Sequence, residues 1–481
     1  MNMMRALNSA MSGLTATAHG TETVAANLAN IKTPGYARRE VVQSAQTMGG
    51  NAGGVRIDSV DRAVNAALLA EMRLATSARS AAAAHSHFTT RVEGVIGMPG
   101  EPQALTTTLT TFRAAIDHAA NRPDDDLRLM RLAETADHLA RGLNAASRDI
   151  QQERLQADHR IDSDVRDLNS GLQRVAYLNR RIAVVEAAGK DTSSLADERQ
   201  STIDRLAQIV PLQEVTRPGG AVALFTLSGG VLLDGTRPAE FGFTPSAQMA
   251  PDSVAGDGTV SHVTLNGQPL TGTRLAMFSG GTLAANLDIR DNRAPAIQRD
   301  LDMLALDLSV RVGVLADPDD DTQPGLFTDA QDVVRADQVA GLAARLALNA
   351  AVSQPAQAWR MRDGVATAAP GNIGESGRLH ALAQALNTVR APMDGSSFTG
   401  AADLAGRFAQ VESRVASSRV ADDADLAVRN SRMEIITARF LKDGVDSDAE
   451  MQRLLQYEQA YAANARVIRA VDEMLDQLLR I

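Results

Sequence analysis

The sequence predicts a mainly α-helical protein with a small inserted β-domain, shaped as an elongated helical bundle rod whose N- and C-terminal helices pair like a coiled coil. Three observations support this prediction. Apolar residues recur at helical spacing through most of the 481 residues. Short apolar runs separated by turn residues replace that spacing only over 212–282. Both ends carry apolar residues at alternating three- and four-residue steps, which is the spacing of a coiled-coil seam.

Composition narrows the classes of function. Aromatic residues make up only 3% of the chain, so the cores must rest on aliphatic side chains and alanine, which suits packed helices. A net charge of −10 argues against nucleic acid as the main partner. The absence of cysteine excludes disulfides, thiolate metal sites and thiol nucleophiles. No apolar run is long enough for a membrane span, and the first twenty residues make a poor Sec-type signal peptide.

Residues 1–60 are expected to form an N-terminal assembly helix and a turn. Apolar and small residues from 7 to 28 follow one narrow helical stripe. The helix should end near Lys32, because Pro34 disfavours a helical residue before it and Gly35 can adopt a left-handed turn. In this segment the residues assigned to an assembly interface are Leu7, Met11, Leu14, Leu28, Asn30, Pro34, Gly35 and Tyr36.

Residues 61–211 should form the first part of a helical rod. Helical spacing runs over 64–96 and 105–116, and a third pattern continues without proline from 124 to 188. As one helix that third segment would be on the order of 100 Å long. The acidic residues at 124–126 suit its start, where carboxylates complement the helix dipole. Gly142 and Gly171 are possible bends.

Residues 212–282 carry the signals of the inserted β-domain. Turn pairs separate short apolar runs, and Asn266-Gly267 is a strong hairpin signal. Helical spacing resumes over 283–442, the second part of the rod. There we expect helical segments around 330–348 and 374–390, a surface loop at 317–325 and a long helix over 404–441.

Residues 443–481 are expected to form the C-terminal assembly helix, with Ser447 as its N-cap. Asn464 is a polar residue of the kind that fixes register in a coiled-coil seam. A two-helix seam buries little surface, so the paired ends should become stably ordered only when other subunits cover them. The alternative is an ordinary amphipathic helix packed on its own domain. The stripe consists of Leu454, Tyr457, Tyr461, Asn464, Ile468, Val471, Leu475 and Leu478.

Both ends resemble the terminal signatures of the flagellar axial proteins, the family of rod, hook and hook-associated proteins. The matching stretches are "LNSAMSGLTATAHGTETVAANLANIKTPGYARRE" and "LLQYEQAYAANARVIRAVDEMLDQLLRI". The middle, with "DLNSGLQRVAYLNRRI", "LADERQSTIDRLAQIV" and "GGTLAANLDIRDNRAPAIQRDLDMLA", is similar to the members that join hook to filament.

This resemblance implies an extracellular structural subunit without cofactor or metal. Its expected partners are further copies of itself in a tubular array, the hook protein, a second junction protein, an export chaperone that binds the C-terminal helix, and the flagellar type III export apparatus. Membrane insertion is not expected.

Two other functions fit parts of the sequence. The chain could be another axial protein, such as a hook, distal rod or flagellin-like subunit, because the terminal signatures are shared. Catalysis, either peptidoglycan cleavage or metal-dependent hydrolysis, is more remote. His85 and His87 form the only close histidine pair, but their spacing places them on different helix faces. No HExxH, GxSxG or phosphate-loop pattern appears.

Overall fold

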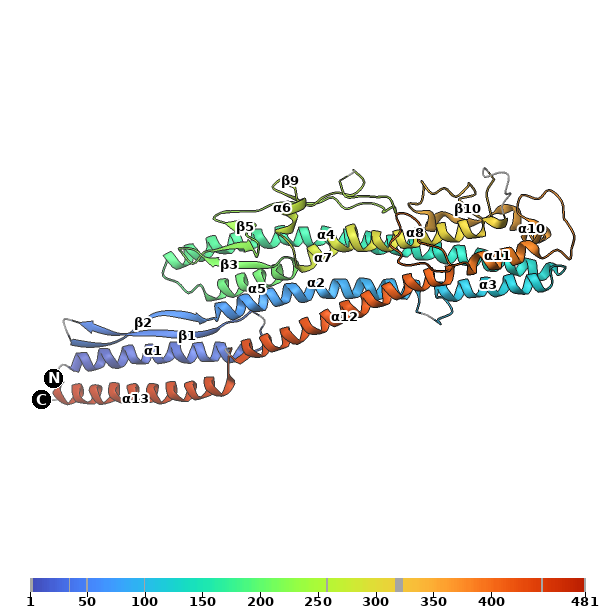
Figure 1. Cartoon of the computed structure of the whole chain (residues 1–481). Coiled ribbons are helices and arrows are strands. Elements are labelled where there is room, and N and C mark those ends of the chain that lie inside the picture. Colours follow the sequence, from blue (N-terminus) through green and yellow to red (C-terminus); the bar gives the residue numbers. More distant parts are fainter. Residues whose placement is uncertain are drawn as a thin grey trace.

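The chain forms a long rod with both termini at one end (Figure 1). We describe it from a computed structural model. The structure describes residues 3–33, 35–48, 51–98, 100–256, 258–315, 323–442 and 444–479.

The end of the rod that carries the termini is made of four elements, which we call the terminal layer. They are α1 (Met3–Ala29), the antiparallel strands β1 (Arg38–Met48) and β2 (Asn51–Ala63), and α13 (Ser447–Leu479). The pairing of the N- and C-terminal helices, predicted from their spacing, is confirmed. The β-hairpin was not predicted. It packs along α1, which gives the two strands the support that an isolated hairpin lacks.

Two helices lead from the terminal layer into the rod. They are α2 (Ala66–Ile96) and α12 (Leu404–Lys442), which lie side by side (Figure 1). Both agree with the helices predicted over 64–96 and 404–441. The prediction of Ser447 as the N-cap of the last helix is wrong. Asp446 caps α13 instead, because its carboxylate accepts the backbone N–H groups of Asp448 and Ala449.

The predicted long helix is α4 (Asp126–Ala187), whose 62 residues extend over about 90 Å. The Asp125 carboxylate caps its start by accepting two backbone N–H groups. The helix continues through both glycines. At Gly171 a Cβ atom would lie 2.5 Å from a methyl group of Leu206, so glycine allows α5 (Ser193–Ile209) to approach closely. The short helix α3 (Leu105–Asn121) packs against the first half of α4.

Two small antiparallel sheets confirm the β-structure predicted over 212–282. The first has the strand order β3-β4-β5-β6 and the second β7-β8-β9. Asn266 and Gly267 both have positive φ and form the predicted hairpin turn between β8 and β9. The strands are β3 (Leu212–Thr216), β4 (Val222–Thr226), β5 (Val231–Asp234), β6 (Arg237–Pro238), β7 (Phe241–Gly242), β8 (Thr264–Leu265) and β9 (Gln268–Pro269).

The chain then returns to helices and closes two hydrophobic cores. One core combines α3, the first half of α4, α8 and α11, and the other combines the second half of α4 with α5, α7 and the sheets. Because α4 contributes to both cores, it acts as the spine of the rod. The returning elements are α6 (Gly272–Ala276), α7 (Gly281–Asp288), the π-helix η1 (Ile289–Arg293), α8 (Ala294–Arg311), the 3₁₀-helix η2 (Val312–Leu315), α10 (Arg360–Asp363) and α11 (Gly377–Asn387).

The prediction of a helix around 330–348 is wrong for most of this range. Only the single turn α9 (Leu342–Arg345) is helical, and β11 (Leu346–Leu348) follows and pairs with β10 (Phe327–Asp329). The buried Asp302 carboxylate accepts the backbone N–H groups of Gly341 and Ala343 and fixes the chain there. Short 3₁₀ turns, η3 (Ala350–Val352) and η4 (Pro355–Gln357), complete this part. Most of the loop predicted at 317–325 lies outside the described residues.

Candidate assembly interface

Helices α1 and α13 run antiparallel, and small residues of α1 form the closest contacts. Gly13 lies against Asn464 and Gly20 against Tyr457, so seven residues forward on α1 correspond to seven residues back on α13. A Cβ atom at Gly20 would come 2.5 Å from the Tyr457 ring. The described residues of α1 that line this contact follow alternating three- and four-residue steps: Ala10, Gly13, Thr17, Gly20, Val24 and Asn27.

The apolar stripe predicted on α1 lies beside this seam, not at its centre. Leu7, Leu14 and Leu28 are half-buried at its edge, and Met11 is 54% exposed. The expectation that this stripe itself meets α13 therefore needs correction. The large Tyr457 and Asn464 side chains require glycine opposite them, and leucine would hold the helices further apart. A role for the stripe in contacts between copies stays a prediction.

The stripe predicted on α13 mostly faces α1. Val471 is buried, and the half-buried residues are Leu454, Tyr457, Asn464, Ile468 and Leu475. Tyr461 instead is 51% exposed. The side chain of Leu478 lies outside the described residues.

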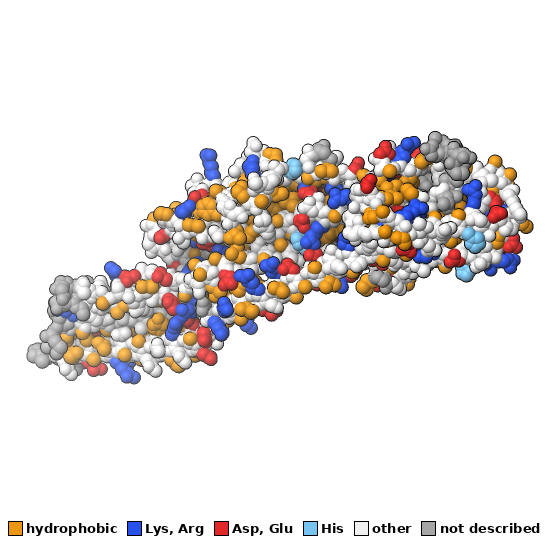
Figure 2. Space-filling model, in the orientation of Figure 1, with side chains coloured by type: hydrophobic (Ala, Val, Ile, Leu, Met, Phe, Trp, Pro, Cys, Tyr) orange, Lys and Arg blue, Asp and Glu red, His pale blue; other side chains and the backbone are white. Residues whose placement is uncertain are grey.

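A second apolar set on α13 is open to solvent. Met451, Leu455, Val467 and Met474 are all exposed. In Figure 2, apolar side chains are interspersed with charged ones over the terminal layer. Only Glu450 and Val471 are buried among the described side chains of α13, so the rod itself does not cover this helix.

Asn27 joins the elements of the terminal layer, although the sequence analysis did not select it. Its side chain is fully buried and every hydrogen-bonding position is used. Nδ2 donates to the Arg39 carbonyl (2.9 Å) and to Glu450 (3.1 Å). Oδ1 accepts the Tyr36 hydroxyl (2.8 Å) and the Arg39 backbone N–H (2.9 Å). One side chain of α1 thus fixes the following turn, β1 and α13.

Glu450, in the first turns of α13, is the partner of Asn27 on the other helix. Its side chain is only 1% exposed and lies 2.8 Å from an Arg453 nitrogen and 3.9 Å from Arg38. A buried carboxylate needs such hydrogen bonds and charges, and its place near a helix N-terminus adds a favourable dipole. Because Arg38 belongs to β1, Glu450 ties α13 to the hairpin as well as to α1.

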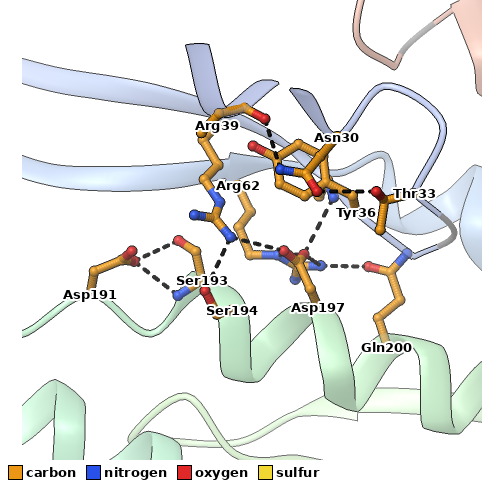
Figure 3. A network of polar contacts seen from close by, with 12 residues as sticks. Asn30, Thr33, Tyr36, Arg39, Arg62, Asp191, Ser193, Ser194, Asp197 and Gln200 are labelled. Atoms are coloured by element: carbon orange, nitrogen blue, oxygen red, sulfur yellow. Dashed lines mark hydrogen bonds and ion pairs between the residues drawn. The ribbon is translucent and has the colours of Figure 1, made fainter. Parts of the chain in front are cut away.

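The turn after α1 docks on α5 through Asp197 (Figure 3). The Asp197 carboxylate accepts hydrogen bonds from Arg39 (3.2 Å), Arg62 (2.8 Å) and the Ala37 backbone N–H (3.3 Å). Arg62 also donates to Gln200 at 2.7 Å. These contacts fix the terminal layer to the rod.

The other turn residues predicted as assembly residues have local roles in the described structure. Gly35 has a φ of +80° and lies against Ser201 of α5. Asn30 accepts the Thr33 hydroxyl at 3.0 Å. Burial raises the pKa of the Tyr36 hydroxyl, while the neighbouring Arg39 opposes this shift. Pro34 lies outside the described residues.

The described residues hold no group of three or more histidine, cysteine or acidic side chains placed to bind a metal ion. Within the same residues, none of the helices has the length and apolar character needed to cross a bilayer. His85 lies beside Asp288 and Arg293, whereas His87 is exposed, so the two rings do not share a site.

Comparison with known proteins divides the chain into the same regions. A family model described as "Flagella basal body rod protein" matches residues 7–36, and "Flagellar basal body rod FlgEFG protein C-terminal" matches 442–481. The model "Flagellar hook-associated protein FlgK helical domain" matches residues 89–314. The two terminal models thus cover α1 with its turn and α13, the elements that pair in the terminal layer. Both ends of the chain are therefore similar to the class of flagellar rod, or axial, proteins.

Individual relatives point to one family within that class. A protein of Bacillus subtilis named "Flagellar hook-associated protein 1" is 23% identical over 98% of this chain and 97% of its own length. Proteins of the same name from Salmonella typhimurium (23% identical) and Escherichia coli (22%) align over 51% and 63% of this chain. Those two alignments span 45% and 55% of the relatives, about half their length. The chain is thus similar to the proteins named flagellar hook-associated protein 1, in one case over nearly its whole length.

A solved structure was also found, entitled "The structure of the flagellar hook junction protein FlgK from Burkholderia pseudomallei". It is 21% identical, covers 54% of this chain and 44% of its own, and superposes with a TM-score of 0.44.

Proposed function

We propose that this chain is a structural subunit of the bacterial flagellum at the junction between hook and filament, and that it assembles through its terminal layer. One observation carries the proposal: α13 pairs with α1 along one face and leaves Met451, Leu455, Val467 and Met474 exposed on others. An apolar surface of this kind on a non-membrane helix is typical of a protein interface. The hook and the junction in this proposal are taken from the names of the relatives.

Several partners follow from this proposal. Further copies of the chain pack side by side through contacts that are not self-complementary, so they build a tube instead of a closed dimer. The hook protein lies on one side of that tube and a second junction protein on the other. Before assembly, the exposed face of α13 needs cover against aggregation, which an export chaperone supplies. The chain leaves the cell through the flagellar type III apparatus and functions outside it.

Deletion of the gene from its own bacterium tests the proposed position in the flagellum. Cells without the chain should build complete hooks that carry no filament and should release flagellin into the medium. Electron microscopy of isolated hook–basal bodies and immunoblots of the medium measure both effects. Absence of hooks would instead indicate a rod or hook subunit, and cells with normal filaments would refute the proposal.

A further inference from the structure

Four arginine residues, three from different elements and one from a turn, line one pocket where the terminal layer joins the rod. The pocket has a volume of about 330 Å³ and lies between the end of β2, α2, α5 and the turn after β3. We call it the arginine pocket. Among the described residues that line it, Glu214 of β3 is the only acidic one. The arginines are Arg62, Arg73, Arg199 and Arg217.

Three of these guanidinium groups have a carboxylate partner. Arg62 pairs with Asp197, Arg217 with Asp234, and Arg73 with Asp204 and Glu214. Arg199 differs, because within the described part of the chain no carboxylate forms an ion pair with it. It is only 9% exposed and donates through Nη1 to the neutral oxygens of Asn179 (3.0 Å) and Gly220 (2.6 Å). A buried cation held only by neutral acceptors lacks the charge compensation that such groups normally have.

The neighbouring cations make the uncompensated charge of Arg199 still less favourable. Burial lowers the pKa of Arg199, and the nearby charges of Arg62 and Arg73 lower it further against the opposing effect of Glu214. Arg73 is 3% exposed, and its Nη2 atom has no hydrogen-bond partner among the described residues. Leaving a buried donor unpaired costs folding free energy, and the cost is larger when the group is charged. Within the described residues, the pocket therefore contains one buried guanidinium group without an ion-pair partner, Arg199, and one unpaired donor atom, Arg73 Nη2.

The walls of the pocket are held in place by the fold. Asn179 of α4 accepts the backbone N–H of Val222 and donates to the carbonyl of the same residue, which fixes the start of β4. Gly219 and Gly220 both have positive φ, and this turn directs the Gly220 carbonyl at Arg199. A Cβ atom at Gly220 would lie 2.9 Å from a methyl group of the buried Ile182, so the turn packs closely on α4.

We propose that the arginine pocket binds an oxyanion, a carboxylate or phosphate group, with Arg199 as its main ligand and Arg62 and Arg73 beside it. Guanidinium groups form short, charge-assisted and often bidentate hydrogen bonds with both kinds of anion. Two sources supply this chemistry: a free anion from solution, and a carboxylate side chain of an adjacent copy in the assembled tube. Only the second source depends on the proposed function.

The first test uses the purified full chain and inorganic phosphate. Calorimetric titration at pH 7.5, with ionic strength held constant by sodium chloride, should show saturable binding to the wild type. Arg199→Gln should weaken binding by about tenfold, because one charge-assisted contact is lost. Arg166→Gln removes the same charge from the exposed face of α4 and should leave binding unchanged. Arg199→Lys keeps the charge but loses the planar guanidinium and should weaken binding severalfold, which covers the case that Arg199→Gln unfolds.

The second test distinguishes the two sources in cells. If phosphate does not bind but Arg199→Gln and Arg199→Lys reduce incorporation into flagella while Arg166→Gln does not, the ligand is a carboxylate of an adjacent copy. Equal melting temperatures of the purified variants are required for this conclusion. Binding of phosphate with normal incorporation identifies a free anion. Failure of wild-type binding together with normal incorporation of both pocket variants overturns the proposal, whether or not the chain acts at the junction.

Discussion

Gly20 sets how closely α1 approaches α13. We predict that Gly20→Ala destabilises the terminal layer by about 1–3 kcal/mol, because the new methyl group meets the Tyr457 ring and forces the helices apart. Hydrogen exchange should show α1 and α13 amides exchanging roughly five to a hundred times faster, with α4 unchanged. Gly94→Ala on an exposed turn of α2, where a Cβ meets no atom within 4 Å, is the control and should be slightly stabilising. Unchanged exchange in Gly20→Ala would contradict the seam.

Asp164 provides a residue-scale prediction on pH. Burial is the main cause that raises its pKa from 3.8 to about 6, and Asp167 adds to the shift. A carboxyl whose pKa is higher in the folded state stabilises the fold below pH 4, and this contribution is lost as pH rises through 6. Asp164→Asn, neutral at every pH and still able to accept from Asn286, should therefore gain in melting temperature over the wild type between pH 5 and 7.5.

Differential scanning calorimetry at the two pH values measures this gain. Asp425→Asn, at an exposed position of α12 that pairs with Arg429, is the matched control. A difference between Asp164→Asn and the wild type that is the same at pH 5 and pH 7.5 would show that Asp164 does not titrate in this range.

At the same scale, the residues that sequence reasoning missed share one property. Gly13, Gly20 and Asn27 also follow seven-residue spacing, but a search for apolar side chains passes over them. Small residues mark a helix contact only when the facing residue is large, as Tyr457 is here, and that pairing is known only from the fold. Asn27 is polar and its burial depends on four partners that the sequence does not bring together.

At the scale of elements, α13 is the one whose loss should abolish assembly. Ile468→Asp and Leu475→Asp each place an unpaired carboxylate in the half-buried face toward α1, which costs several kcal/mol. We expect both variants to lose motility and incorporation into flagella while far-ultraviolet circular dichroism shows the rod intact. Leu227→Asp, at an exposed position after β4, makes the same change outside the terminal layer and should be neutral. Normal motility of both α13 variants would rule out the seam assignment.

Elements with a long, regular pattern were predictable, and those that depend on distant contacts were not. The period of α4 persists over 62 residues, so its burial on one side decides its structure. The hairpin of β1 and β2 contains charged residues and depends on α1 and α5 for support. In β11, the apolar residues fit both a helix and a strand, and pairing with β10 decides between them. Local pattern is insufficient where such partners determine the structure.

At the scale of the whole molecule, the rod and the terminal layer differ in how firmly they are held. The rod surrounds α4 with two cores, whereas α13 packs on α1 and is joined to α12 by a short turn. We predict that limited trypsin digestion of the purified chain cuts first beside Lys32 and Lys442, which are exposed at the ends of α1 and α12.

Trypsin has more potential cleavage sites in α4, which contains ten arginines, than at the two turns. Preferred cleavage at the turns is therefore a stringent test of the stability of α4. Cleavage requires local unfolding of the backbone, which opposes attack on a helix buried in two cores. Mass spectrometry of the early fragments should therefore find a core that retains all of α4 and a released segment that contains α13. Once the bond after Lys442 is broken, the pairing with α1 and the Glu450 contacts are what hold α13. Early fragments that begin or end inside α4 would show that the terminal layer, not the rod, is the more stable part.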